Sequence, residues 1–245
     1  MTFHWQSFGA PKRGNSASEY EDACAANPKA GRFAIADGAS ESSFAALWAR
    51  LLVERFTHLP PKRSARTDWL TPLQQRWSSE VDKLELPWYA EAKRELGASA
   101  TFLGLVLKRS VDRRSGIWLA RAVGDCCIFQ IHNERLVKAF PLTCSSEFCD
   151  RPNLLNSKPE RNQSHQQALK EIRSRWCVGD RFLMMTDAIA QWFLSRHEQA
   201  GKPWQEIARM LPDGMPDKAF DSWIEKLRTQ SDLRNDDVTL VAIDP

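Results

Sequence analysis

The sequence predicts an α+β protein built in layers, and three observations support this class. Short apolar segments of strand length recur from one end of the chain to the other. Longer segments with the apolar spacing of amphipathic helices lie between them. Four of the strand-like segments follow one another between residues 99 and 140 with short turns between them. Runs of neighbouring strands interleaved with helical pairs favour this class over a parallel nucleotide-binding sheet.

The N-terminal quarter predicts strand, loop, strand and helix in that order. Residues 3–8 have the pattern of an opening strand, residues 11–20 that of a polar loop and residues 33–37 that of a buried strand. Residues 41–58 predict a helix, because apolar side chains recur there at helical spacing and prolines follow at positions 60 and 61.

A second helix and a group of strands come next. The helix is expected from residue 69 or 72 to residue 96, with a break near Pro87 left open. Turn signals between the strands predict an antiparallel meander, with Arg113 and Arg114 at an exposed hairpin tip. The four strands are expected at residues 99–107, 117–123, 126–132 and 135–140.

The remaining chain predicts a long loop followed by a strand, helices and a closing strand. Residues 144–173 are polar and rich in Asn, Gln, Ser and Pro, which indicates a loop or flap. After it we expect strands at residues 181–186 and 238–243 and helices at residues 188–197, 204–211 and 218–229.

Length and charge indicate one sizeable domain, residues 1–245, without a dedicated nucleic-acid surface. The net charge is +3, and the Lys and Arg residues are spread along the chain. Residues 1–10 lack the basic start and apolar stretch of a signal peptide, and no segment approaches the roughly 20 apolar residues of a membrane span. We therefore expect a soluble, cytoplasmic protein with neither nucleic acid nor membrane as a partner.

The six cysteines predict neither a disulfide framework nor a zinc site. They are scattered along the chain, and Cys126 and Cys127 are neighbours on an expected strand, where their side chains point to opposite faces. Cys144 and Cys149 lack the second cysteine pair or the spaced histidines that a zinc motif needs.

Acidic residues stand at the ends of several apolar segments. Asp37 and Asp187 each close such a segment, and Asp236 precedes the last one. Glu21 and Asp22 offer further oxygen ligands just before the first of these segments. Carboxylates that converge at buried strand ends require cations, and oxygen ligands favour Mg²⁺ or Mn²⁺. The alternative is that each aspartate starts an ordinary turn.

The order of these segments resembles the type 2C (metal-dependent) protein phosphatase family along nearly the whole chain. Each tripeptide alone is unspecific, but six of them occur here in the order and with spacing like that of the family. The six are Glu21-Asp22-Ala23, Ala36-Asp37-Gly38, Gly97-Ala98-Ser99-Ala100-Thr101, Val123-Gly124-Asp125-Cys126, Thr186-Asp187-Ala188 and Asp236-Asp237-Val238-Thr239.

This resemblance implies a four-layer α-β-β-α sandwich with two central antiparallel sheets, and a bacterial-type serine/threonine phosphatase domain. It implies hydrolysis of phosphoserine and phosphothreonine in proteins by two Mn²⁺ or Mg²⁺ ions, with a third ion in some members. The implied partners are a phosphorylated protein substrate and a cognate serine/threonine kinase system. In the implied site Asp37 bridges the ions, the Gly38 carbonyl joins one ion, and Asp187 and Asp236 join the other.

Three further acids have implied roles around this pair of ions. Glu21 and Asp22 would act largely through metal-bound water, and Asp125 would help Asp187 to hold the third ion. Gly38 also has a rationale of its own, since a backbone that approaches a metal tolerates no bulky neighbour and can need a positive φ.

Several positions depart from the family pattern. Ala39-Ser40 stand where many members carry a proton-donating His, so a metal-bound water or another group must protonate the leaving alkoxide. Ala17 replaces the usual phosphate-binding Arg, and Arg13 or Lys12 could take its place or could be solvated loop charges.

Other departures concern the metal motifs. Asp237 replaces the usual Asn and could be a ligand instead of Asp236 if the register slips by one residue. Ala188 replaces a Gly beside Asp187, a small change that should still permit a metal. Residues 143–173 stand in place of the recognition flap of many members, so substrate choice cannot be carried over.

Two other functions stay open at this point. A pseudophosphatase would use the same fold to bind a phosphoprotein or partner without turnover, which the missing His and the displaced Arg would suit. A phosphatase for small phosphate esters would share the metal site.

Overall fold

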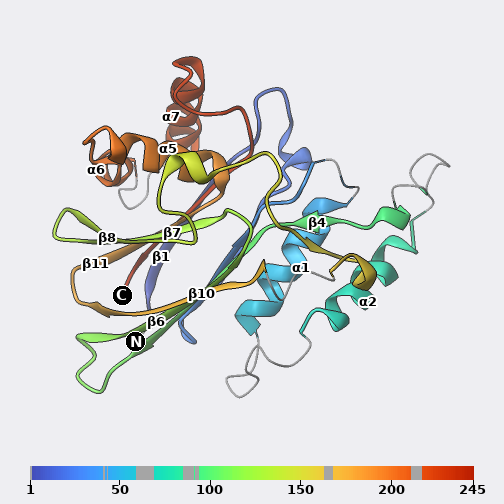
Figure 1. Ribbon diagram of the computed structural model, residues 1–245, viewed down its shortest axis with the longest axis horizontal. Helices are drawn as coiled ribbons and strands as arrows, with labels where there is room; N and C mark the ends of the chain where they lie inside the picture. The colour runs from blue at the N-terminus through green and yellow to red at the C-terminus, as the bar shows by residue number, and fades with distance from the viewer. Residues whose placement is uncertain are drawn as a thin grey trace.

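The computed structural model describes residues 2–40, 42, 44–58, 69–84, 91, 94–162, 168–210 and 217–245. Two antiparallel sheets of five strands each pack face to face, and helices cover both outer faces (Figure 1). This arrangement confirms the α+β class and the four-layer α-β-β-α sandwich.

Each sheet combines strands from distant parts of the sequence. The first sheet has the order β1 (His4–Ala10), β12 (Val238–Asp244), β11 (Asp180–Met185), β7 (Cys127–His132) and β8 (Arg135–Phe140). The second sheet has the order β10 (Lys170–Cys177), β6 (Ser115–Val123), β5 (Phe102–Arg109), β3 (Arg32–Ala36) and β2 (Ala23–Asn27). A short ribbon pairs β4 (Ser99–Ala100) with β9 (Leu155–Asn156).

The helices form the two outer layers. In Figure 1, α5 (Asp187–Glu198), α6 (Pro203–Arg209) and α7 (Asp217–Thr229) lie on the side of the first sheet. On the other side, α1 (Ala45–His58) packs on β2 and β3, and α2 (Thr71–Val81) packs on α1. Single turns of 3₁₀ helix occur at Ala17–Glu19, Ser145–Glu147 and Pro159–Arg161.

Three apolar cores separate the four layers, and strand alternation divides side chains among them. On β12, Val241 and Ile243 enter the core between the sheets, whereas Leu240 and Ala242 enter the core beneath α5 and α7. Successive strand side chains point to opposite faces, so a strand covered on both faces is apolar at nearly every position. This explains why every residue from 238 to 243 except Thr239 is apolar.

The expected meander of four strands is wrong. β5 pairs with β6 and β7 pairs with β8, but these two hairpins belong to different sheets. The chain crosses between the sheets at Gly124, whose φ of 95° is a conformation that glycine adopts readily. The expected strand at residues 99–107 is also two strands in the structure. β4 pairs with β9 in a separate ribbon, and β5 then joins the second sheet.

Two edge strands, β2 and β10, were absent from the sequence prediction. β2 consists mainly of half-buried alanines, which are poor strand formers. β10 begins at Lys170, inside the predicted loop or flap. Its residues Glu171, Arg173 and Arg175 place charge at every second position, as an exposed edge does.

The predicted helices differ from the structure mainly at their ends. α1 begins at Ala45, four residues later than expected. α2 ends at Val81, whereas the predicted helix continued to residue 96. The predicted break at Pro87 lies outside the described residues, and residues 91 and 94–96 are helical.

Two other local expectations are confirmed, namely the exposed turn at Arg113 and Arg114 and the opposite faces of Cys126 and Cys127. Arg113 and Arg114 lie in the exposed turn between β5 and β6. Cys126 enters the core between the sheets, Cys127 enters the core beneath the helices, and all six cysteines are free thiols. Among the described residues, no helix has the length and apolar character that crossing a membrane requires.

We expect Gly104→Ala to destabilise the protein by about 1–3 kcal/mol through overpacking. A Cβ at Gly104 would come within 2.7 Å of the Phe56 ring, which packs against Phe102. Urea unfolding measures the change. Phe56→Leu in the same chain should remove most of the added cost, and strictly additive effects of the two substitutions would contradict this packing.

Candidate metal centre

Five aspartates at strand ends converge on one edge of the sandwich. Asp22 directly precedes β2, Asp37 follows β3, and Asp125 lies between β6 and β7. Asp187 opens α5 just after β11, and Asp236 lies two residues before β12. Their charges act on one another, which requires the carboxyls to be near neighbours although they come from both sheets.

The end of β3 is held by the segment that precedes β5. Thr101 donates its amide to the Asp37 carbonyl at 2.9 Å, and its hydroxyl accepts from the Asp37 amide at 3.2 Å. Ala39 donates to the Ser99 carbonyl at 2.9 Å. The Gly97–Thr101 motif therefore fixes the backbone on both sides of Asp37.

Gly38 is required by close packing. A Cβ there would lie 2.7 Å from the Glu21 carbonyl oxygen and 3.0 Å from the Ala45 side chain. The positive φ that the sequence suggested for Gly38 is wrong, because Gly38 is not among the positive-φ glycines of the described chain.

Asp22 is buried at the meeting point of three motifs. Its Oδ2 accepts hydrogen bonds from the hydroxyls of Thr186 at 2.9 Å and Thr239 at 2.8 Å. Its Oδ1 is also buried but has no partner among the described residues. One oxygen is thus held by the protein, and the other is buried without a hydrogen-bond partner among the described residues.

Asp237 binds the N-terminal loop through both of its side-chain oxygens. Its two oxygens accept the backbone amides of Lys12 and Glu21, each at 2.7 Å. Burial raises the pKa of the half-buried Glu21 carboxyl, and the charge of Asp237 adds to this effect. Both oxygens of Asp237 thus have backbone partners, and its charge adds to the effect of burial in raising the pKa of Asp22. The charge of Asp236 likewise adds to burial in raising the pKa of Asp37, Asp125 and Asp187.

Burial and mutual repulsion raise the pKa of the clustered carboxyls. For Asp37 burial is the largest cause, and the charges of Asp22 and Asp187 raise its pKa further, well above the usual range. Burial raises the pKa of Asp125 to about 7, with Asp187 as the next cause. The pKa of Asp22 is raised well above its usual range, again chiefly by burial. Such shifts are typical of a site that needs cations.

Arg234 is the residue of this edge that the sequence analysis missed. Its guanidinium forms an ion pair with Asp187 and lies 3.3 Å from an Asp236 oxygen. Its charge lowers the pKa of both Asp187 and Asp125, against the effect of burial. The position of Arg234 two residues before Asp236 was the sequence signal that could have indicated it. The sequence alone does not show which groups a long side chain contacts.

Arg13, the predicted phosphate-binding residue, lies against α7. Its Nε donates to Glu225 Oε2 at 2.8 Å, and a terminal nitrogen donates to the Thr229 hydroxyl at 2.9 Å. The structure therefore does not bring the Arg13 guanidinium together with the five aspartates.

The donor set fits hard divalent ions. All the clustered donors are oxygens, as Mn²⁺ and Mg²⁺ prefer. Buried oxygens of Asp22 and Asp125 lack hydrogen-bond partners among the described residues. An unpartnered buried carboxylate is costly unless a cation meets it.

A different group of potential ligands lies at the other end of β11. His132 Nδ1, Cys177 Sγ and an Asp180 oxygen lie within 4.8 Å of one another. Asp180 is already paired with His132 at 2.7 Å and accepts from Gln130 at 2.8 Å and from the Cys177 amide at 2.9 Å. The six residues of β11, at about 3.3 Å per residue, separate this group from the acidic cluster by roughly 20 Å.

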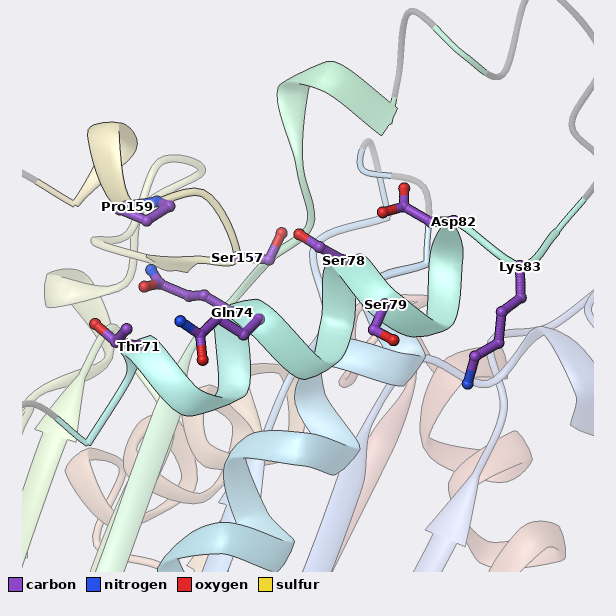
Figure 2. Close-up of a pocket in the computed structure, with 9 residues that line it drawn as sticks. Thr71, Gln74, Ser78, Ser79, Asp82, Lys83, Ser157 and Pro159 are labelled. Carbon is purple, nitrogen blue, oxygen red and sulfur yellow. The ribbon is translucent and has the colours of Figure 1, made fainter.

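A groove of about 600 Å³, lined mostly by residues of polar type, runs along α2 (Figure 2). Gln74, Ser78 and Asp82 line it on the helical side, and Ser157 and Pro159 line it on the other. None of the predicted site residues lines this groove.

Comparisons with known proteins find similarity at the level of structure. No protein-family model matches the chain, and no curated protein matches it. The photosystem II phosphatase PBCP is 16% identical over 99% of this chain and 98% of its own, with a TM-score of 0.59. The serine/threonine phosphatase Stp1 from Staphylococcus aureus is 11% identical over 100% and 96%, with a TM-score of 0.60.

A third structure contains metal. The catalytic domain of the serine/threonine phosphatase PstP, in complex with two manganese ions, is 14% identical over 99% of this chain and 98% of its own, with a TM-score of 0.60. At these identities the likeness establishes the fold, and that fold is the one of the type 2C metal-dependent serine/threonine phosphatases.

Proposed function

We propose that this chain hydrolyses phosphoserine and phosphothreonine in proteins, with two Mn²⁺ or Mg²⁺ ions held by the acidic cluster. The observation that carries the proposal is the set of buried, mutually repelling carboxylates with two unpartnered oxygens. A phosphorylated protein would be the substrate, and a serine/threonine kinase system would supply it. The cytoplasmic location expected from the sequence stays a prediction.

Each residue of the cluster has a proposed part. Bound divalent ions would polarise the phosphoryl oxygens and lower the pKa of a bound water. Asp37 and the Gly38 carbonyl would hold one ion, and Asp37 with Asp187 and Asp236 would hold the other. Glu21, Asp22 and Asp125 would act around them, Asp125 with Asp187 at a third ion.

The phosphate contact also has a candidate. Arg13 stays our proposal for a residue that grips phosphate oxygens, since the loop around it joins the Glu21–Asp22 motif. To do so its guanidinium would have to leave Glu225 and Thr229.

A binding module without turnover is the second candidate function. The observation in its favour is the ion pair of Arg234 with Asp187, which places a side-chain cation against two proposed metal ligands. An inactive wild-type protein at every metal concentration would support this candidate.

We expect Asp37→Asn to lower kcat for a phosphothreonine peptide by roughly a hundredfold or more, because the substitution removes charge where the reaction needs it. Burial and repulsion already disfavour the Asp37 carboxylate, so the free energy of unfolding in chelator should hold or rise. The matched control is Asp82→Asn on the exposed end of α2, which should keep full activity. Undiminished turnover by Asp37→Asn would contradict the proposed function.

The stability of the chelator-treated protein should fall as the pH rises from about 4 to 7. Folding raises the pKa of Asp125 to about 7, above its unfolded value of about 3.9, so the folded state holds a proton that the unfolded state has released. For this one carboxyl the loss is about 1.4 kcal/mol per pH unit within that window. Asp125→Asn should flatten the profile measured by urea unfolding, and identical pH profiles for the two proteins would contradict the shift.

A further inference from the structure

Arg234 brings a positive charge to one half of the acidic cluster. Its guanidinium is paired with Asp187 and lies 3.3 Å from Asp236. These two aspartates are the ones that, under the proposed function, hold the second ion together with Asp37. A guanidinium that reaches both carboxylates neutralises them as a divalent ion would, although with a smaller charge.

The backbone that carries Arg234 is anchored on both sides. Leu233 is buried, and its amide and that of Asp232 donate to the Leu227 carbonyl at 3.4 and 3.0 Å. Beyond Arg234, the guanidinium of Arg228 donates to the Asp236 carbonyl at 2.5 Å. The backbone on both sides of Arg234 is therefore held in place next to the cluster.

The side chain itself can leave without moving this loop. It is 41% exposed, whereas the Asp187 side chain is 13% exposed. An arginine has several rotatable bonds beyond its Cβ and keeps its charge in water. Withdrawal of the guanidinium would uncover both carboxylates.

We propose that Arg234 is an internal counter-cation that competes with the second divalent ion for Asp187 and Asp236. This inference rests on the proposed function, because it assigns those two aspartates to a metal. The half of the site formed by Asp37 and Gly38 then binds its ion first. The other half fills at a higher metal concentration, at which the ion displaces the guanidinium.

Arg234→Gln tests the proposal through metal binding. The full chain, stripped by chelator, is titrated with MnCl₂ by calorimetry, and electron paramagnetic resonance reports the spin coupling of a two-ion site. We expect a strong and a weak Mn²⁺ event in the wild type. In Arg234→Gln the weak event should tighten about tenfold or more, because the competing charge-assisted contact is gone.

The unfolding midpoint gives a second readout that is independent of activity. Without metal, Arg234→Gln should unfold at lower urea than the wild type, because the carboxylates lose their counter-charge. Arg181→Gln is the matched control, since its ion pair with Asp244 at 2.7 Å lies at the other end of β11, away from the cluster. It should change neither the Mn²⁺ affinity nor the response to chelator. Should Arg234→Gln fail to fold, Arg234→Lys, which keeps the charge but loses the fork, should show intermediate Mn²⁺ affinity.

The two proposals fail differently. Equal or weaker binding of the second Mn²⁺ ion in the Arg234 variants, with two ions bound to the wild type, would overturn the competition alone. Absence of Mn²⁺ binding from both the wild type and Arg234→Gln, with Asp37→Asn indistinguishable from them, would overturn the proposed function together with this inference.

Discussion

Repulsion among buried carboxylates is the constraint on which the rest of this structure depends. Burial and neighbouring charges raise the pKa of Asp22, Asp37 and Asp125, so the cluster cannot be ionised without compensation. Two threonine hydroxyls compensate one oxygen of Asp22, and the Arg234 guanidinium compensates Asp187 and Asp236. Buried oxygens of Asp22 and Asp125 stay unpartnered among the described residues, which is where divalent cations would act.

The sandwich makes this concentration of charge possible because it is rigid where the acids are placed. Strands of both sheets end at the same edge, and large apolar cores hold those strands. Asp237 links the two ends of the chain, because it accepts a hydrogen bond from the amide of Glu21, 216 residues away in sequence. Gly38 lets the Glu21 segment and α1 approach the end of β3 closely. The same contacts that bring the acids together therefore also limit how far they can move apart.

Much of this architecture could be predicted from local sequence, because a strand buried on both faces is apolar at nearly every position. In β12 all of residues 238–243 except Thr239 are apolar. The sheet to which each strand belongs could not be predicted from local sequence. The turn signals between β6 and β7 are those of a hairpin, but after Gly124 the chain continues in the other sheet. The edge strand β2 was not predicted, because alanine has little preference for strands. At the site, the motifs indicated Asp37, Asp187 and Asp236, but the contact of Arg234 with a residue 47 positions away depends on the folded chain.

The central claim is that this acidic edge binds divalent ions through its carboxylates. The most direct measurement is a crystal structure of the protein grown with MnCl₂, with anomalous scattering used to locate manganese. The account predicts two anomalous peaks beside Asp37, one of them between Asp187 and Asp236, and an Arg234 side chain turned away from both. A crystal without manganese at this edge, in which Arg234 still pairs with Asp187, would contradict it.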